Sequence, residues 1–320
     1  MELREMGPDD RGAVLDLLEH AFGVRELFER YMDHDPAFSP GDFLLALDDD
    51  RALVACVQIF HKTIRLRGQA VSLGGIGSVA TRAAQRGQGV SSTLLERAIE
   101  RMREQEMKLS LLFAAPIAPL YERLGWLRFP LPLLRLTPKE PTQQPPASAG
   151  RAFAPADLEP VKALYEAYTE KLSGPTVRDA RYWRGQLRTA GTPEEDFRVA
   201  EQRGKIRAYA RIASFNGRLR GLEYARDARG AKALAQLLAA HAYGPGTLHV
   251  PYVHDPELAE ALDFSGIATK LSRDPGPMWR VLDRAVVARL AGLPESSSDE
   301  ALLTPLVGAP ALVYWPSDRF

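Results

Sequence analysis

The sequence has few features that would place the protein outside the cell or in a membrane. Its 320 residues include one cysteine, Cys56, so no internal disulfide can form. Cys56 lies in an apolar strand pattern, which indicates core packing and not a nucleophile. Prolines interrupt the longest apolar run, at 109–120, and no run approaches the ~20 residues of a membrane-spanning helix. The first residues, Met-Glu-Leu-Arg-Glu, place acids before any apolar segment, unlike a signal peptide. These absences predict a cytoplasmic protein.

The chain also lacks net charge, since 41 lysines and arginines balance 41 acids. Nothing in this balance indicates binding to nucleic acid or to an anionic membrane. The first 50 residues, however, contain 14 acidic and 4 basic side chains. This local excess is typical of a solvated helical face, or of an acidic rim that attracts cationic substrates.

Proline marks a boundary near the middle of the chain. The stretch 138–150 contains four prolines and shows no hydrophobic periodicity, which predicts a linker at 139–150. We expect a first domain at 1–138, a second domain at 151–276 and a short extension at 277–320.

The two predicted domains repeat the same order of elements. In each, two helices precede antiparallel strands, and a strand, a helix, another strand and a short helix follow. The segment Leu-Tyr-Glu-Arg-Leu-Gly-Trp at 120–126 aligns without gaps with Leu-Ala-Glu-Ala-Leu-Asp-Phe at 258–264. The repeat predicts tandem copies of one α/β (α+β) fold, with mixed, mostly antiparallel sheets flanked by helices.

Glycines gather between a strand predicted at 76–79 and a helix predicted at 90–107. Unpaired N–H groups at such a helix start, together with the helix dipole, attract a diphosphate. A dinucleotide-binding fingerprint would follow the first strand of a parallel unit, which is not the case here. A P-loop is excluded because the Gly-Lys-Ser/Thr ending is missing.

The segment Arg86-Gly87-Gln88-Gly89-Val90-Ser91 resembles the Arg/Gln-x-x-Gly-x-Gly/Ala loop of the GNAT acyltransferases, with Ser91 in the place of the last Gly or Ala. The order of elements resembles that family as well. The resemblance implies acetyl-CoA as co-substrate and no metal. It also implies that one short strand end and one loop bind the coenzyme, through Ser78, Val79, Ala80, Arg86, Gly87, Gln88, Gly89, Val90 and Ser91.

Many GNAT enzymes have a tyrosine at the start of the helix that follows the central strand, and Tyr121 stands at that place. Its ordinary pKa of about 10 suits proton donation to a coenzyme thiolate. The alternative is a core tyrosine. The second copy has Ala259 at the matching position and no Arg-x-x-Gly-x-Gly/Ala loop, which predicts a degenerate domain.

Tandem domains with the complete loop in the first copy resemble the Eis ("enhanced intracellular survival") family. There the terminal carboxylate, on a final Phe, folds back into the first domain as general base, which implies this role for Phe320. The departure is that only about 40 residues follow the second domain, so a sterol-carrier-like third domain is truncated or absent. Other candidate bases are His61 or Glu122 acting through water.

We therefore predict an N-acetyltransferase that acts on a primary amine of a cationic acceptor, such as an aminoglycoside, a polyamine or lysine. Two alternatives are a mycothiol-synthase-like acetyltransferase and a non-catalytic acyl-CoA sensor or scaffold. A homo-oligomer is expected from the resemblance, and no nucleic acid or membrane partner is expected.

Overall fold

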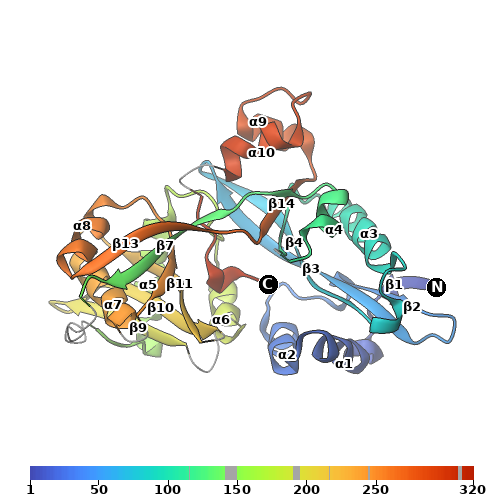
Figure 1. Cartoon of the computed structure of the whole chain (residues 1–320), viewed down its shortest axis with the longest axis horizontal. Helices are drawn as coiled ribbons and strands as arrows, with labels where there is room; N and C mark the ends of the chain where they lie inside the picture. The colour runs from blue at the N-terminus through green and yellow to red at the C-terminus, as the bar shows by residue number, and fades with distance from the viewer. Residues whose placement is uncertain (115, 141–149, 190–194, 216, 244–245, 309–311) are drawn as a thin grey trace.

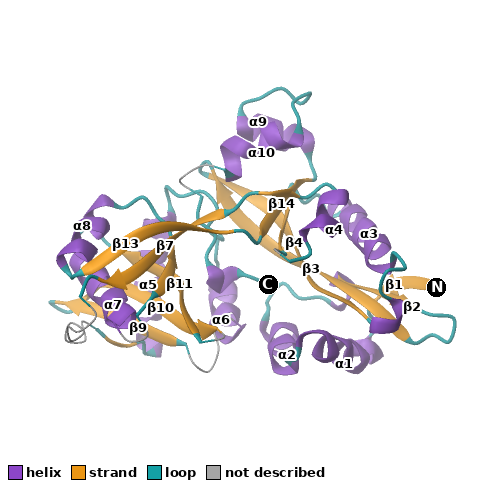
Figure 2. Cartoon of the chain, in the orientation of Figure 1, coloured by secondary structure: helices purple, strands orange, loops and turns teal. Residues whose placement is uncertain are grey.

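The computed structural model describes residues 1–114, 116–140, 150–189, 195–215, 217–243, 246–308 and 312–320. The chain forms two seven-stranded sheets that lie side by side, each flanked by helices (Figure 1, Figure 2). The predicted mixed α/β fold with two GNAT-like units is thereby confirmed. Most of the predicted linker, 141–149, lies outside the described residues.

The first unit begins with two helices packed against an antiparallel meander. Helix α1 presents Val14, Leu17 and Leu18 to the core at helical spacing. It ends at Gly23, whose φ of 74° suits glycine. The elements of this unit are β1 (Glu2–Glu5), α1 (Arg11–Phe22), α2 (Arg25–His34), β2 (Phe43–Leu47), β3 (Leu53–Leu66), β4 (Gln69–Thr81), α3 (Val90–Glu104), β5 (Leu109–Phe113), α4 (Ala118–Arg123) and β6 (Leu127–Arg128).

The second unit repeats this order and some of its local detail. In the first unit the N–H of Gly7 donates to Asp10, which pairs with Arg4. In the second unit the N–H of Ala154 donates to Asp157, which pairs with Arg151 in the same way. The elements are β8 (Arg151–Ala152), α5 (Leu158–Thr169), α6 (Ala180–Thr189), β9 (Asp196–Gln202), β10 (Lys205–Phe215), β11 (Arg218–Arg226), α7 (Ala231–Tyr243), β12 (Leu248–Pro251), α8 (Pro256–Phe264) and β13 (Ile267–Asp274).

The two sheets exchange one strand each. The first sheet has the order β1-β2-β3-β4-β5-β14-β6 and the second β8-β9-β10-β11-β12-β7-β13. Strand β7 (Leu131–Pro138) follows the first unit in sequence but lies between β12 and β13. Strand β14 (Pro277–Val281) follows the second unit but lies between β5 and β6. Figure 1 shows the green β7 within the left half and the red-orange β14 within the right half.

This exchange differs from two expectations. The expected first domain, 1–138, includes β7, which belongs to the second sheet, and the expected extension begins with β14, a strand of the first sheet. Apolar patterning indicates that a strand exists and which of its faces is buried, but not which sheet it joins. The domain limits 1–138, 151–276 and 277–320 stay a prediction. Each folded sheet contains one strand from beyond the limits of its own domain, β14 in the first sheet and β7 in the second.

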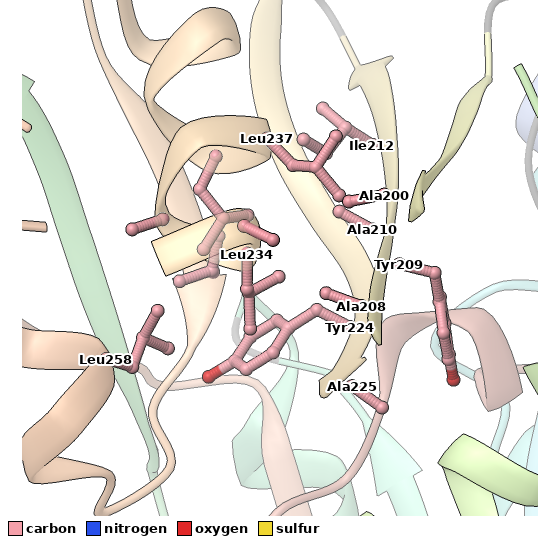
Figure 3. Packing of buried hydrophobic residues seen from close by; sticks show 14 of the residues in the cluster. Ala200, Ala208, Tyr209, Ala210, Ile212, Tyr224, Ala225, Leu234, Leu237 and Leu258 are labelled. Carbon is pink, nitrogen blue, oxygen red and sulfur yellow. The ribbon is translucent and has the colours of Figure 1, made fainter. Parts of the chain in front are cut away.

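The second core lies between its sheet and helices α7 and α8. Figure 3 shows Tyr224 pointing toward Leu234 and Leu258. Tyr209, on the neighbouring strand, points away from them on the other side of the sheet. The remaining helices, α9 (Arg284–Ala291) and α10 (Asp299–Val307), pack on the first sheet in a cluster with Leu109. Within the described ranges, no helix is long and apolar enough to span a membrane.

Candidate active site

A gap opens between β4 and β5 in the middle of the first sheet. The two strands pair in parallel only from Leu73 to Gly75 on the β4 side. Beyond Gly75, β4 continues to Thr81 and pairs with β3 alone within the described chain. The β5-facing edge of 76–81 therefore presents free backbone groups, which an extended peptide-like ligand can pair with.

A β-bulge at Ser78 accompanies this divergence. Cys56 pairs with Ala80 and Gln58 with Gly77, so β4 has one more residue than β3 in this interval. Such a bulge bends its strand and is common beside active sites. Ser78 has φ 51°, an uncommon value for a residue with a side chain.

Buried polar contacts hold Ser78 in this conformation. Its hydroxyl donates to Gln58 Oε1 at 2.8 Å, and the Cys56 thiol donates to its carbonyl oxygen at 3.3 Å. Burial raises the pKa of Cys56 to about 12, so the thiol stays protonated at neutral pH. These contacts are consistent with a structural role for Cys56.

The glycine-rich loop after β4 leads into α3. Gly87 and Gly89 have φ of 78° and 82°, values that other residues rarely adopt. No side chain caps α3 at Gly89, so the first N–H groups of this helix are free to bind an anion. A hydrogen bond of 2.6 Å between the Thr81 and Ser91 hydroxyls ties the end of β4 to the start of α3.

The predicted coenzyme-binding side chains differ in exposure. Arg86 is exposed, and its Nε donates to the Thr81 carbonyl at 3.2 Å. Val90 and Ala80 are buried in hydrophobic clusters, so only their backbone groups can contact a coenzyme.

Tyr121 lies on α4 and packs edge-on against Trp126, with ring centroids 6.1 Å apart. Its side chain is 4% exposed, and burial raises its pKa to about 12. Among the described residues, none forms a hydrogen bond with the hydroxyl, which is thus available to donate. In the second unit Ala259 lies on the equivalent helix, α8, and offers no such group.

The last residue of the chain lies against the glycines of β4. The Phe320 ring stacks on Phe60 at a centroid distance of 5.0 Å. A Cβ on Gly75 would lie 2.4 Å from Cζ of that ring, and a Cβ on Gly77 would lie 3.5 Å from the Phe320 carbonyl carbon. Sequence reasoning missed these two glycines, although glycine inside a strand pattern is a signal for close approach. The carboxyl end of the chain thus lies beside the residue that precedes Ser78.

A buried ionic network holds the tail from the second unit. The Arg178 guanidinium donates to Asp318 at 2.8 Å and to Glu223 at 2.5 Å, and all three side chains are inaccessible to solvent. Ser317 donates to Glu223 at 2.6 Å. Burial alone would raise the pKa of Glu223, but the charge of Arg178 outweighs it and holds that pKa below its ordinary value. The network therefore fixes the tail two residues before Phe320.

The other two candidate bases already have partners. His61 Nε2 lies 2.7 Å from Asp42 Oδ1, and Arg128 donates to Glu122 at 2.5 Å. Within the described residues, the hydrogen-bond partners of these two side chains are Asp42 and Arg128, and not the Phe320 tail. The geometry therefore favours the terminal carboxylate over both as the group next to the β4 gap.

A cavity of about 700 Å³ lies beside the tail, between α2 and β11. Tyr31 lines it and donates from its hydroxyl to the Arg319 carbonyl at 3.3 Å. The lining also carries two glutamates and four arginines: Glu19, Glu26, Arg25, Arg30, Arg220 and Arg319. The walls are thus not acidic, contrary to the rim expected from the sequence.

Ion pairs account for this difference. The acids of residues 1–50 that lie within ion-pair distance of a basic group are Glu2, Glu5, Asp10, Asp16, Glu19, Glu29, Asp33, Asp35, Asp42 and Asp49. Arginines and a lysine from later in the chain supply several of the partners, for example Arg101 for Glu5 and Lys62 for Asp35. A local count of charge could not include them.

Known proteins share this fold. Residues 2–128 match the family described as an acetyltransferase (GNAT) domain. A probable N-acyltransferase from Enterococcus faecalis is similar at 18% identity over 88% of this chain and 72% of its own, with a TM-score of 0.68. A GCN5-related N-acetyltransferase from Kribbella flavida shares 20% identity over 100% and 84% of the two chains, with a TM-score of 0.65. Eis1 from Mycobacterium abscessus shares 14% over 92% and 76%, with a TM-score of 0.60. No curated protein matches the sequence.

Most of the first unit, residues 2–128, thus matches an acetyltransferase (GNAT) domain, and this match supports an acyltransferase enzyme. The structural similarities extend over both units and show the tandem fold. Within the described residues, no three His, Cys, Asp or Glu side chains are grouped to hold a metal ion.

Proposed function

We propose that the protein transfers an acetyl group from acetyl-CoA to a primary amine. The observation that carries this proposal is the meeting of three features at one point of the first sheet: the gap between β4 and β5, the free start of α3, and Phe320 against Gly75 and Gly77. The pantetheine arm would pair with the edge of 78–80, and the amides of 87–91 would bind the diphosphate. Arg86 would add charge-assisted contacts.

The transfer requires two proton movements, and the proposal assigns one to each end of the site. The Phe320 carboxylate accepts the proton that the acceptor ammonium loses before attack. The amine then attacks the thioester carbonyl, and a backbone N–H at the bulge stabilises the oxyanion. Tyr121 gives its proton to the departing thiolate, and the proton that the nitrogen loses as the amide forms restores the phenol. Burial, which raises the pKa of Tyr121, also makes an unsolvated thiolate more basic.

The proposal is Eis-like in its use of the chain end as a base. Its support here is positional: the second unit, through Arg178, holds Asp318 and thereby the tail that reaches the first unit. The degenerate domain thus has a role without binding a coenzyme. The cationic acceptor predicted from the sequence stays a prediction, and the cavity beside the tail is lined by side chains of both signs.

The test is acetyl transfer from acetyl-CoA to a panel of primary amines that includes cationic, neutral and anionic compounds. Thiol release together with an acetylated amine, lost in Tyr121→Phe, supports the proposal. Tight acetyl-CoA binding without turnover on any amine would instead support a sensor.

A further inference from the structure

The outer face of the second sheet carries a row of three cations and one histidine. The register pairs Lys270 with Arg135, Arg135 with His249, and His249 with Arg220. Residues paired across neighbouring strands share a face, so these four side chains lie on one face of β13, β7, β12 and β11. With about 4.8 Å between strands, the row is about 14 Å long.

Among the described elements, no helix packs extensively on this face of the three strands β13, β7 and β12. The helices packed on those strands are α7 and α8. Both lie on the opposite face, because Leu136, Leu248 and Ile267 join a core cluster with Leu234 and Leu262. The cationic side chains thus face away from that core.

Among the described residues, the arginines and the lysine of the row form no ion pair; Arg220 acts on Asp274 only at longer range, where its charge helps to lower the pKa of that acid. Across the described ranges no carboxylate lies within 4.0 Å of Arg135, Arg218, Arg220 or Lys270. The acid that lines this face, Asp274, is already engaged by the Arg319 guanidinium and by the N–H of Gly276. Four unpaired cations on one face repel each other, and an anion bound between them would relieve that repulsion.

The positive charges of the neighbouring arginines act on His249. Partial burial lowers the pKa of His249, and the charges of Arg135, Arg220 and Arg218 lower it further. The ring is consequently neutral at neutral pH in the free protein. An anion among the three guanidinium groups would cancel their effect and raise this pKa.

A cavity of about 220 Å³ lies against this row and is lined by Arg218, Arg220, His249, Ser272 and Arg319. Two of its lining groups, Ser272 Oγ and Arg319 Nε, are buried without a hydrogen-bond partner. Buried donors without a partner are rare, and a bound ligand is one explanation for them. The cavity also shares Arg220 and Arg319 with the larger cavity beside α2.

We propose that this face is an oxyanion subsite, and that it binds a phosphate or carboxylate group of the amine acceptor. We name the subsite by Arg135, Arg218, Arg220, His249 and Ser272. Guanidinium groups bind both oxyanions through paired N–H donors. Arg319, at the edge of the subsite, directly precedes Phe320, so an acceptor anchored here lies along the tail that carries the base. The inference rests on the proposed acetyl transfer, and it makes the acceptor an amine that also carries an anionic group.

Binding is tested first without any reaction. The probes are sodium pyrophosphate and sodium succinate, each added at constant ionic strength so that screening does not change. We expect saturable binding by calorimetry and, in NMR titrations, a rise in the pKa of His249. Arg220→Ala should weaken binding about tenfold, close to the loss of one charged hydrogen bond. Arg229→Ala, which removes an exposed arginine elsewhere in the unit, is the matched control.

The acceptor class is tested with pairs of amines of equal length that differ at the far end. 5-Aminovalerate and an aminoalkylphosphonate are compared with n-pentylamine as acceptors of the acetyl group. We expect kcat/KM at least tenfold higher for the anionic amines, a preference that Arg220→Ala removes and Arg229→Ala keeps. The relative rates of the phosphonate and the carboxylate then show which oxyanion the subsite prefers.

The two proposals fail in different ways. An unchanged His249 pKa with both probes, or equal kcat/KM for charged and neutral amines, overturns the subsite even if amines are acetylated. Saturable pyrophosphate binding with a shifted His249 pKa, but no transfer to any amine, supports the subsite and overturns the transfer reaction.

Discussion

At the scale of single residues, the proposed chemistry depends on Tyr121 and on the carboxyl end of Phe320. Both groups are held by apolar contacts, Tyr121 by Trp126 and Phe320 by Phe60 and Phe113. These ring contacts orient Tyr121 and Phe320 without involving the Tyr121 hydroxyl or the terminal carboxylate. The Tyr121 hydroxyl and the terminal carboxylate are therefore left for a substrate.

The first prediction concerns Tyr121→Phe. We expect the rate of acetyl transfer to fall about 10²- to 10⁴-fold, the usual contribution of a general acid, with acetyl-CoA affinity unchanged. Stopped assays of transfer and calorimetry of coenzyme binding measure the two quantities. Tyr252→Phe, which removes a hydroxyl from the second unit, is the control. Equal losses in both variants would count against the role.

The second prediction is the pH dependence of the same group. Because burial raises the pKa of Tyr121 to about 12 from 10.0, the phenol stays protonated through neutral and mildly alkaline pH. Its contribution to folding is fully present below pH 10 and is lost as pH rises toward 12. A pH–rate profile of the wild type should thus show no alkaline decline from Tyr121 below about pH 10. A decline near pH 8 that Tyr121→Phe abolishes would refute this assignment.

At the scale of elements, the site depends on β4. This strand bulges at Ser78, separates from β5 after Gly75, and has glycines where Phe320 approaches. A side chain at Gly75 would occupy the place of the Phe320 ring, whereas a Cβ at Gly77 would first meet the Phe60 ring, at 2.9 Å. The strand thus makes the coenzyme edge and the seat of the terminal residue at once.

The third prediction follows from the contact between Phe320 and Gly75. In Gly75→Ala the new methyl group would lie 2.4 Å from the Phe320 ring, so the tail must shift. Overpacking of this kind costs about 1–3 kcal/mol. We expect slower acetyl transfer, with coenzyme affinity preserved because the α3 loop is untouched. Gly12→Ala, on α1 with no atom within 4 Å of the added group, should leave activity unchanged. Full activity of Gly75→Ala would show that the position of the tail is not needed.

At the scale of the whole molecule, strand exchange and the Arg178 network join the two units. Each sheet needs a strand whose neighbours in sequence belong to the other unit. The network then links residues of the second unit to the tail that rests on the first. The two units are expected to fold and act as one body.

The fourth prediction tests the exchange. A fragment of residues 1–138 lacks β14 and so exposes the edge of β5, and it also carries β7 without its partners. We expect this fragment to be insoluble or to aggregate through its unpaired edges. The full chain cut by a protease within 141–149 should stay a folded complex by gel filtration. Separation of the halves after cleavage would contradict the exchange.

The fifth prediction tests the network. Arg178→Met removes the cation between Glu223 and Asp318 and leaves two buried carboxylates with hydrogen bonds from neutral groups but without that counter-charge, which should lower the free energy of unfolding by about 3–5 kcal/mol at pH 7. In the wild type the pKa of Glu223 is held below its ordinary 4.5, so its stabilising contribution is present above pH 4.5 and lost below. In the variant the carboxylates favour protonation, so the deficit should shrink as pH falls toward 5. Urea unfolding of both proteins at pH 7 and pH 5 measures this, and an equal deficit at both would argue against it.

The sequence by itself determined the elements and the backbone part of the site. The helices were predicted from hydrophobic residues at helical spacing and from stop residues such as Gly23. Most strands were predicted from their apolar patterns. Both kinds of pattern depend only on residues that are close in sequence. The loop at 86–91 and Tyr121 were visible for the same reason, since a short motif contains the whole of its signal. The repeat of the two units was visible through local order as well.

Only the tertiary structure decided what depends on distant residues. It placed β7 and β14 in each other's sheets, because strand pairing is chosen by register across the whole chain. It paired a few of the acids of the first 50 residues with basic residues later in the chain, such as Glu5 with Arg101 and Asp35 with Lys62. It also brought Phe320 to Gly75 and assembled Arg135, His249 and Arg220 from three strands. Charge, burial and cavity shape arise between residues that are separate in sequence, and those are the properties that choose the acceptor.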